Sequence, residues 1–305
     1  MERERGLAYG IDNNMKYQRV GLHVSAAGGV ENAPRRAREF KAECFQFFSR
    51  SPRGGEAPTI SSEQANDFRA QCKRYELESY IHTPYYINFA SGKKSLAAAA
   101  PHIVREELRR GSQLGVRYVV THMGSAKDFA EKDTGYKTQI PNTALKQAAD
   151  GLRKVFSENP RFSTKLLLEI AAGAGEIIGH TFEELAYLLK ELGRSDVHVC
   201  LDTGHMFASG YDIRDTAAVE DTMRQFRKVG GGHRLKLVHV NDSKVGLGER
   251  KDFHEHIGKG EIGSQGFRTL LAHKDFQKVN FILETKHDRL IKEDLEFLKK
   301  YRAVR

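Results

Sequence analysis

The chain has 305 residues and a formal net charge of +9. No apolar run approaches the roughly 20 residues that a membrane-spanning helix needs. Residues 1–18 are polar and lack the apolar stretch of a secretion signal, so we expect a short tail ahead of a protein that is neither membrane-inserted nor secreted. The basic surplus favours a polyanionic partner such as nucleic acid, although a solvated basic surface would explain the charge equally well.

The three cysteines, Cys44, Cys72 and Cys200, are odd in number and widely spaced. They form no C-x-x-C pair, which disfavours both a disulfide framework and a cysteine-ligated zinc site. Free thiols are typical of a reducing intracellular compartment, and we expect the protein to act in one, a cytoplasm or nucleus.

Short apolar segments alternate with amphipathic segments along the chain. The second helix opens on a capping box, Ser61 with Gln64 three residues later, and Pro101 lies inside the third helix, which it could break. The predicted elements, in chain order, are strand 19–25, helix 29–41, strand 44–49, helix 61–77, strand 79–83, helix 95–115, strand 118–122, helix 141–159, strand 165–170, helix 181–193, strand 197–202, helix 216–230, strand 235–240, helix 264–274, strand 280–285 and helix 289–302.

This regular alternation predicts an α/β protein with a parallel sheet. Eight strand–helix units in about 285 residues match the size of a (β/α)₈ TIM barrel. The alternative is a doubly wound open sheet, but no G-x-G-x-x-G motif follows any predicted strand. We therefore expect one barrel domain over residues 19–305.

The stretch VCLDTGHMFASG carries the first sign of chemistry. Asp202 ends a buried strand and His205 follows three residues later, so one rigid strand end holds a carboxylate and an imidazole. D-x-x-H is common by chance, and Asp202 could equally cap the next helix. The stretch alone is weak support for a metal site.

The same arrangement recurs at the other strand ends, where a TIM barrel places its active site. Nine such residues without a thiolate suit zinc or manganese, and they could serve two or three ions if one carboxylate bridges. Each residue alone could be a hydrogen-bonded core residue, but nine buried polar groups cannot easily satisfy one another. The nine are His82, His122, Glu169, Asp202, His205, His239, Asp252, His254 and Glu284. His23 and His256 fall near the same mouth and could support the ligands from behind.

These motifs, in this order, resemble the endonuclease IV family of zinc-dependent apurinic/apyrimidinic endonucleases. The resemblance runs from about residue 19 to the end and rests on eight segments: GLHVSAAGGVENA, HTPYYIN, THMGS, LLLEIAAGAG, CLDTGHMFASGYD, HVNDSK, DFHEHIGKGEIG and ILET.

The resemblance implies a barrel that holds about three Zn²⁺ ions, with Mn²⁺ as an alternative at some sites. His82, His122 and Glu169 would bind the first ion. Glu169 would bridge to a second ion, which Asp202, His239 and Glu284 would also bind. His205, Asp252 and His254 would bind the third.

The same resemblance implies a monomer that acts on double-stranded DNA in base excision repair. It would hydrolyse the phosphodiester 5′ to an abasic site and leave a 3′-OH and a 5′-deoxyribose phosphate. Arg53 and Tyr85 would enter the DNA at the lesion. Glu169 or Glu284 would orient the attacking water, and the residues do not decide between them.

The chain departs from the family pattern at a few positions. Ile170 and Ala171 replace two polar residues, which puts in doubt the hydrogen bonds around Glu169 but not the ligand itself. The other departures are Met123, Gly204, Ser51 and Gly54, the last two in the loop that carries Arg53.

Two other function classes stay open. A sugar isomerase or epimerase on the same barrel also uses Glu, Asp and His at its strand ends, but it needs only one or two metal ions and is usually not basic. A non-catalytic DNA-binding barrel would not need the complete ligand set. The added Asp252 and His254 and the net charge favour the nuclease.

Overall fold

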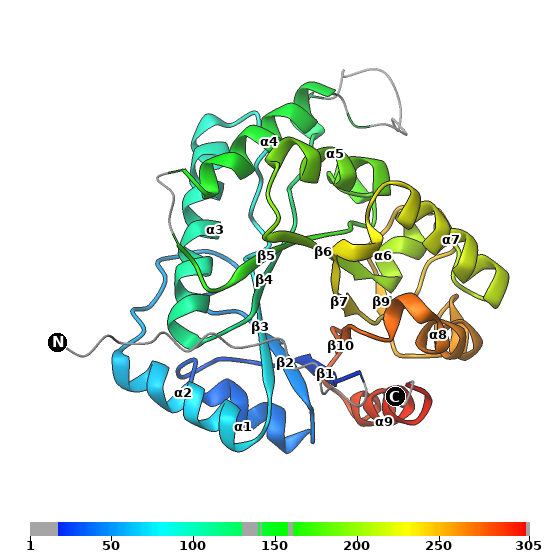
Figure 1. Ribbon diagram of the computed structural model, residues 1–305, viewed down its shortest axis with the longest axis horizontal. Coiled ribbons are helices and arrows are strands. Elements are labelled where there is room, and N and C mark those ends of the chain that lie inside the picture. Colours follow the sequence, from blue (N-terminus) through cyan, green and yellow to red (C-terminus); the bar gives the residue numbers. More distant parts are fainter. Residues whose placement is uncertain (1–17, 130–139, 141, 158–160, 303–305) are drawn as a thin grey trace.

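Eight parallel strands close into a barrel in the computed structural model, and helices surround it (Figure 1). The structure describes residues 18–129, 140, 142–157 and 161–302. Around the barrel the strands run in the order β1-β10-β7-β6-β5-β4-β3-β2. The strands are β1 (Val20–His23), β2 (Cys44–Phe47), β3 (Glu78–His82), β4 (Tyr118–Thr121), β5 (Lys165–Glu169), β6 (Val197–Asp202), β7 (Leu235–His239) and β10 (Asn280–Leu283). The predicted (β/α)₈ TIM barrel is confirmed.

The outer layer consists of helices that follow the strands and bury one face against them. They are α1 (Asn32–Glu39), α2 (Ser62–Arg74), α3 (Lys94–Leu114), α4 (Asn142–Val155), α5 (Phe182–Leu192), α7 (Thr216–Lys228), α8 (Gly263–Ala272) and α9 (Leu290–Tyr301). The predicted capping box opens α2: Ser61 Oγ accepts from the Gln64 amide at 3.1 Å, and Gln64 Oε1 accepts from the Ser61 amide at 3.0 Å.

Pro101 does not break its helix, contrary to the possibility that the sequence raised. Helix α3 continues from Lys94 to Leu114 with Pro101 inside it. A proline removes one backbone hydrogen bond, but Ala100, Pro101, Val104 and Leu108 are all buried on the same side of the helix. Their burial against the barrel keeps the helix continuous.

Two insertions interrupt the strict alternation predicted from the sequence. Short helix α6 (Thr203–Ala208) begins directly after β6. The strands β8 (Asp242–Ser243) and β9 (His254–Glu255) pair antiparallel within the segment between β7 and α8. Both insertions lie just past carboxyl strand ends, where they add side chains to the mouth of the barrel.

The barrel is packed throughout. Eight buried residues fill its interior, among them Tyr80, Leu167 and Ile282, and a larger apolar layer lies between the strands and the helices. Cys44 and Cys200 belong to the interior layer, and all three cysteines are free thiols. The interior is therefore a core and not a channel, which leaves the mouth as the place for a site.

The predicted tail, residues 1–18, lies outside the described residues except for Gln18. That residue is buried, and its side-chain amide donates to the Phe276 carbonyl at 3.0 Å. Within the described part of the chain, no helix is both long enough and apolar enough to cross a bilayer.

Candidate metal centre

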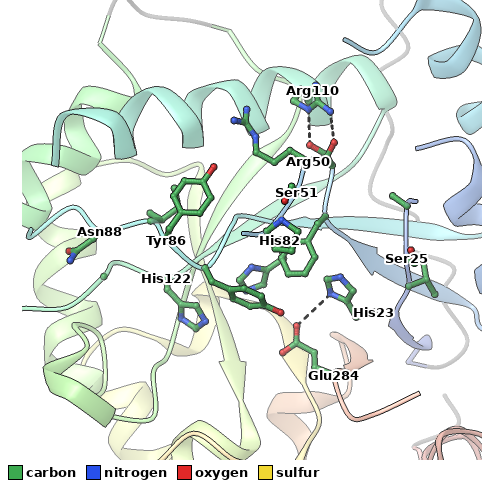
Figure 2. Close-up of a pocket in the computed structure, with 18 of the residues that line it drawn as sticks. His23, Ser25, Arg50, Ser51, His82, Tyr86, Asn88, Arg110, His122 and Glu284 are labelled. Atoms are coloured by element: carbon green, nitrogen blue, oxygen red, sulfur yellow. Dashed lines mark hydrogen bonds and ion pairs between the residues drawn. The ribbon is translucent and has the colours of Figure 1, made fainter. Parts of the chain in front are cut away.

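A cavity of about 1430 Å³ opens at the carboxyl ends of the strands. Of the nine predicted ligands, His82, His122, His205, Asp252, His254 and Glu284 line it directly. Figure 2 shows His82 and His122 close together, with Glu284 and His23 on a neighbouring part of the wall. The other three, Glu169, Asp202 and His239, are fully buried beneath it.

The first group of candidate ligands comprises His82, His122 and Glu169. Glu169 Oε2 lies 2.9 Å from His82 Nε2 and 3.3 Å from His122 Nε2. His82 Nδ1 lies 2.7 Å from the Thr83 carbonyl, which fixes the ring and leaves Nε2 facing the centre. Two imidazoles and a carboxylate oxygen thus converge on one point.

The second group comprises Glu169, Asp202, His239 and Glu284. His239 Nδ1 lies 2.8 Å from Glu169 Oε1, 3.2 Å from Glu284 Oε2 and 4.0 Å from Asp202 Oδ2. Glu169 therefore belongs to both groups, with one oxygen turned to each. This is the geometry that a bridging carboxylate requires.

The third group comprises Asp202, His205 and His254. Asp252 lies beside it, with Oδ1 3.2 Å from His205 Nε2 and 3.5 Å from His254 Nε2. The structure thus adds Asp202, 3.6 Å from His254 Nε2, to the three residues that the resemblance implied. All nine predicted residues are brought together at one mouth.

Asp202 has the capping role that the sequence left open, and it also faces the other candidate ligands. Its Oδ1 accepts from the His205 amide at 2.8 Å and so caps α6. Its Oδ2 faces the centre and accepts from Asn241 Nδ2 at 2.6 Å. The cap sets the start of α6 and thereby places His205 one turn beyond the strand end.

Three ring nitrogens of the candidate ligands have no hydrogen-bond partner among the described residues. They are His122 Nδ1, His205 Nε2 and His254 Nε2, and all three are buried. A buried polar atom without a partner is costly, and neutral imidazole nitrogens next to carboxylates are the donor set of a divalent metal ion. The residues therefore fit a metal centre.

Burial and neighbouring charges shift the pKa values of three candidate ligands. Burial lowers the pKa of His122 to about 4, so that this ring is neutral and able to ligate. Burial by itself would raise the pKa of Glu169, but the neighbouring imidazoles, among them His239 through a direct hydrogen bond, hold it well below its usual range. Burial likewise opposes a charged His205, yet Asp202 and Asp252 raise its pKa well above the usual value. The carboxylates around His205 thus favour a positive charge at this place, which a protonated imidazole or a bound cation can supply.

Two buried side chains that the sequence did not single out hold the ligands in place. Gln46 Nε2 donates to Glu284 Oε1 at 2.5 Å, and its Oε1 lies 2.9 Å from His239 Nε2. Asn241 donates to Asp202 and accepts from the Glu284 amide at 2.8 Å. Polar residues within or directly after otherwise apolar strands were the only signal available.

Asp242 is a third residue that the sequence did not single out. This buried carboxylate accepts from the backbone amides of residues 243, 258, 260, 262 and 263, at 2.8–3.2 Å. It therefore closes the base of the segment that carries Asp252 and His254. A side chain on Gly260 would come within 2.3 Å of the Ser243 carbonyl, so glycine is required for this close approach.

The two supporting histidines predicted from sequence have different outcomes. His23 lies at the centre, with Nδ1 3.1 Å from Gln46 Nε2 and 3.9 Å from Glu284 (Figure 2). His256 instead turns away: its Nδ1 lies 2.6 Å from Asp294 Oδ2 on α9. Its Nε2 lies 3.3 Å from Asp288 Oδ2, so both ring nitrogens face carboxylates outside the nine candidate ligands.

The two predicted DNA-contacting residues lie near the rim. Tyr85 lines the cavity and its side chain is 69% exposed. Burial of part of the ring, together with Glu284 and Asp252, raises the pKa of its hydroxyl. Arg53 is exposed on the loop after β2, and it is not among the residues that line the cavity.

At three of the departures from the family pattern, the residue present makes a backbone hydrogen bond or fits a close contact. Ile170 is buried, and its carbonyl lies 2.9 Å from His205 Nδ1, so this position still orients a ligand. The Ala171 carbonyl accepts from Ser209 Oγ at 2.7 Å. A side chain on Gly204 would lie only 3.2 Å from His254 Cδ2, which explains a small residue there.

The chain is similar to known proteins over nearly its whole length. Residues 34–301 match the family described as xylose isomerase-like TIM barrel. A protein named "Probable endonuclease 4" from Carboxydothermus hydrogenoformans is 38% identical over 93% of this chain and 96% of its own length. One of the same name from Aquifex aeolicus is 37% identical over 87% and 90%.

Solved structures agree with these relatives. Endonuclease IV from Thermus thermophilus superposes with a TM-score of 0.78 at 30% identity, covering 92% of this chain and 99% of that one. A D-tagatose 3-epimerase-like protein reaches a TM-score of 0.68 at 19% identity, over 92% and 96% of the two chains, which shows a shared fold alone. Identity of 38% along almost the full length of both chains, together with the superposition on an endonuclease IV, places this chain in the endonuclease IV family.

Proposed function

We propose that this protein is a metal-dependent apurinic/apyrimidinic endonuclease of base excision repair. It hydrolyses the phosphodiester 5′ to an abasic site in double-stranded DNA and leaves a 3′-OH and a 5′-deoxyribose phosphate. Membership of the endonuclease IV family supports this reaction. The observation that carries it is Glu169, whose two oxygens face two different ligand groups at the base of one open cavity.

The centre is proposed to hold about three zinc ions, with manganese as an alternative at some positions. His82, His122 and Glu169 would hold the first ion. Glu169 would share the second with Asp202, His239 and Glu284, and His205, Asp252 and His254 would hold the third. Because Asp202 also lies 3.6 Å from His254, it is placed to contribute to the third position as well.

When bound, such ions stabilise the charge that develops on the phosphate and lower the pKa of water toward neutrality. Between the two carboxylates proposed to orient the attacking water, exposure favours Glu284. Glu284 lines the cavity, whereas Glu169 is fully buried beneath it. Gln46 donates to one Glu284 oxygen, which leaves the other oxygen, near His239, turned toward the centre.

The DNA would be held at the rim by basic and aromatic side chains. Lys93, Lys127 and the exposed ring of Tyr85 line the cavity. An abasic nucleotide has no base to unstack, so turning it into this mouth costs less free energy than extruding an intact nucleotide. That difference supports selectivity for abasic sites. The protein is proposed to act as a monomer.

The sugar isomerase alternative loses its support. The epimerase and xylose isomerase structures that superpose on this chain are 14–19% identical, a likeness of fold alone. The endonuclease relatives, in contrast, match at 34–38% identity. A non-catalytic DNA-binding barrel would leave the nine clustered side chains without a role.

The deciding experiment is cleavage of a duplex with one abasic site. The expected products are a strand ending in 3′-OH and a strand beginning with a deoxyribose phosphate, resolved by gel and mass spectrometry. The same duplex without the lesion is the control. Absence of strand cleavage by zinc-loaded protein, or equal cleavage of both duplexes, would contradict the proposal.

Affinity for the abasic duplex is expected to fall steeply with salt. If lysine and arginine side chains neutralise phosphates, log affinity should fall linearly with log salt, with a slope of about −0.9 per contacted phosphate. Arg53→Glu should weaken binding, whereas Arg224→Glu on outer helix α7 should have little effect, since Arg224 pairs with Asp221. A flat salt response would mean that the net charge is only a solvated surface.

A further inference from the structure

A polar face of α3 lies against the loop between β2 and α2, residues 48–61, called here the β2–α2 loop. Glu106, Glu107, Arg110 and Gln113 share this face, because residues three, four and seven apart align on a helix. Arg110 and Glu107 are almost fully buried. Figure 2 shows Arg110 and Arg50 together at this helix, as part of the cavity wall.

Arg110 binds both ends of the β2–α2 loop with one guanidinium. Its Nη1 donates to the Pro58 carbonyl at 2.7 Å, and its Nε donates to Ser49 Oγ at 2.7 Å. Its Nη2 donates to the Ser49 carbonyl. The planar, multivalent donor thus ties residue 49 to residue 58 across the base of the loop.

Glu107 completes this arrangement from the same helix. Its Oε2 accepts from Ser49 Oγ at 2.5 Å, and its Oε1 accepts from Arg50 Nε at 2.6 Å. Gln113 Nε2 donates to the Ile60 carbonyl at 2.8 Å. The buried Glu107 carboxylate is paired with the guanidinium groups of Arg50 and Arg110. Loss of either arginine would leave this charge under-compensated, so the members of the cluster depend on one another.

The tip of the loop has no comparable anchor among the described contacts. Arg53 is exposed there, and its amide lies 3.3 Å from Ser51 Oγ in a local turn. The tip reaches the segment after β3: a side chain on Gly54 would approach Tyr86 to 4.0 Å. The base reaches it too, since the Phe48 ring lies 5.2 Å from that of Tyr85.

We propose that Arg110 is a positioning residue for DNA capture. By closing the base of the β2–α2 loop on α3, it presents Arg53 at the rim and holds the Phe48 ring against that of Tyr85. This inference rests on the proposed function, because it concerns how the same site meets abasic DNA. Arg110 belongs to the cavity wall, but it is only 4% exposed and its guanidinium nitrogens donate to Ser49 and Pro58, so it acts through the loop.

The test is Arg110→Lys, which keeps a positive charge beside Glu107 but cannot bridge two carbonyls as a planar fork does. Affinity for the abasic duplex should fall about tenfold, as expected for lost charge-assisted hydrogen bonds. The single-turnover rate at saturating DNA and the bound metal should be unchanged. Trypsin should cut after Arg53 at a faster rate in the variant, which reports the freed loop directly.

Arg105→Lys is the matched control. Arg105 lies on the same helix and also clamps backbone carbonyls, with Nε donating to the Val155 carbonyl at 3.0 Å, but at the end of α4. The Arg105→Lys substitution should change neither the affinity for the abasic duplex nor the rate at which trypsin cuts after Arg53. Melting temperatures of both variants show whether the barrel stays folded, and Glu107→Gln serves as a second variant if Arg110→Lys is too unstable to purify.

The outcomes separate the two claims. If the Arg110 and Arg105 variants bind DNA and resist trypsin alike, or if the Arg110 variant loses rate and not affinity, the positioning role is overturned. If the wild-type protein neither binds nor cleaves abasic duplex, the proposed function fails. In that case a faster cut after Arg53 in the Arg110 variant would still support the clamp on the loop.

Discussion

Glu169→Gln should slow single-turnover cleavage of an abasic duplex by about 10³-fold or more, because several kcal/mol of transition-state stabilisation is lost. Glutamine keeps the size but removes the charge. The two Glu169 oxygens lie 2.9 Å from His82 Nε2 and 2.8 Å from His239 Nδ1. In the variant, an NH₂ group would replace one of these oxygens and would face an imidazole nitrogen. The two ligand groups would lose their shared member, and the positions of both would shift.

DNA affinity should change much less in this variant, since the phosphate contacts lie at the rim. The buried neighbour Ile170 offers no substitute ligand. Glu220→Gln is a suitable control, because that carboxylate pairs with Arg227 on the surface of the outer layer and should leave the rate unchanged. Cleavage by the Glu169 variant within about tenfold of wild type would show that Glu169 is not the bridge.

Metal removal should abolish cleavage and destabilise the fold. Protein purified without chelators should contain about three zinc or zinc-like ions per chain by elemental analysis. Exhaustive chelation should lower the cleavage rate by about 10³-fold or more, and added Zn²⁺ should restore it. The melting temperature should fall as well, because a ligand that binds only the folded state stabilises it by mass action.

Metal removal should lower stability because most of the candidate ligands are buried polar groups. Without a cation, the fully buried Glu169 and Asp202 rely on imidazoles for compensation, and three ring nitrogens stay unsatisfied. Matched protein treated with chelator pre-saturated with zinc controls for the chelator itself. Active, chelator-free protein that carries one ion or none would overturn the trinuclear assignment.

The sequence missed local features that depend on contacts distant in the chain. Pro101 looked like a helix breaker because only its own backbone effect was visible, whereas burial of its helix face kept α3 continuous. Helix α6, six residues long, is too short for periodicity to predict, and the cap from Asp202 defines its start. Likewise, nothing in the local sequence distinguishes His23, which faces Glu284, from His256, which turns to Asp294.

The sequence by itself determined the barrel, its eight strands and the nine candidate ligands, six of which lie at or directly after carboxyl strand ends. It could do so because buried parallel strands are read from short apolar runs, and because the fold requires that every such run end at the same mouth. The residues alone left the grouping of the ligands open, and only the family resemblance implied it. The tertiary structure decided that Asp202 also lies beside the third group, and that Gln46, Asn241 and Asp242 support the ligands. Those relations join residues tens to hundreds of positions apart through single hydrogen bonds, and such pairings depend on strand register and loop closure in three dimensions rather than on composition or spacing.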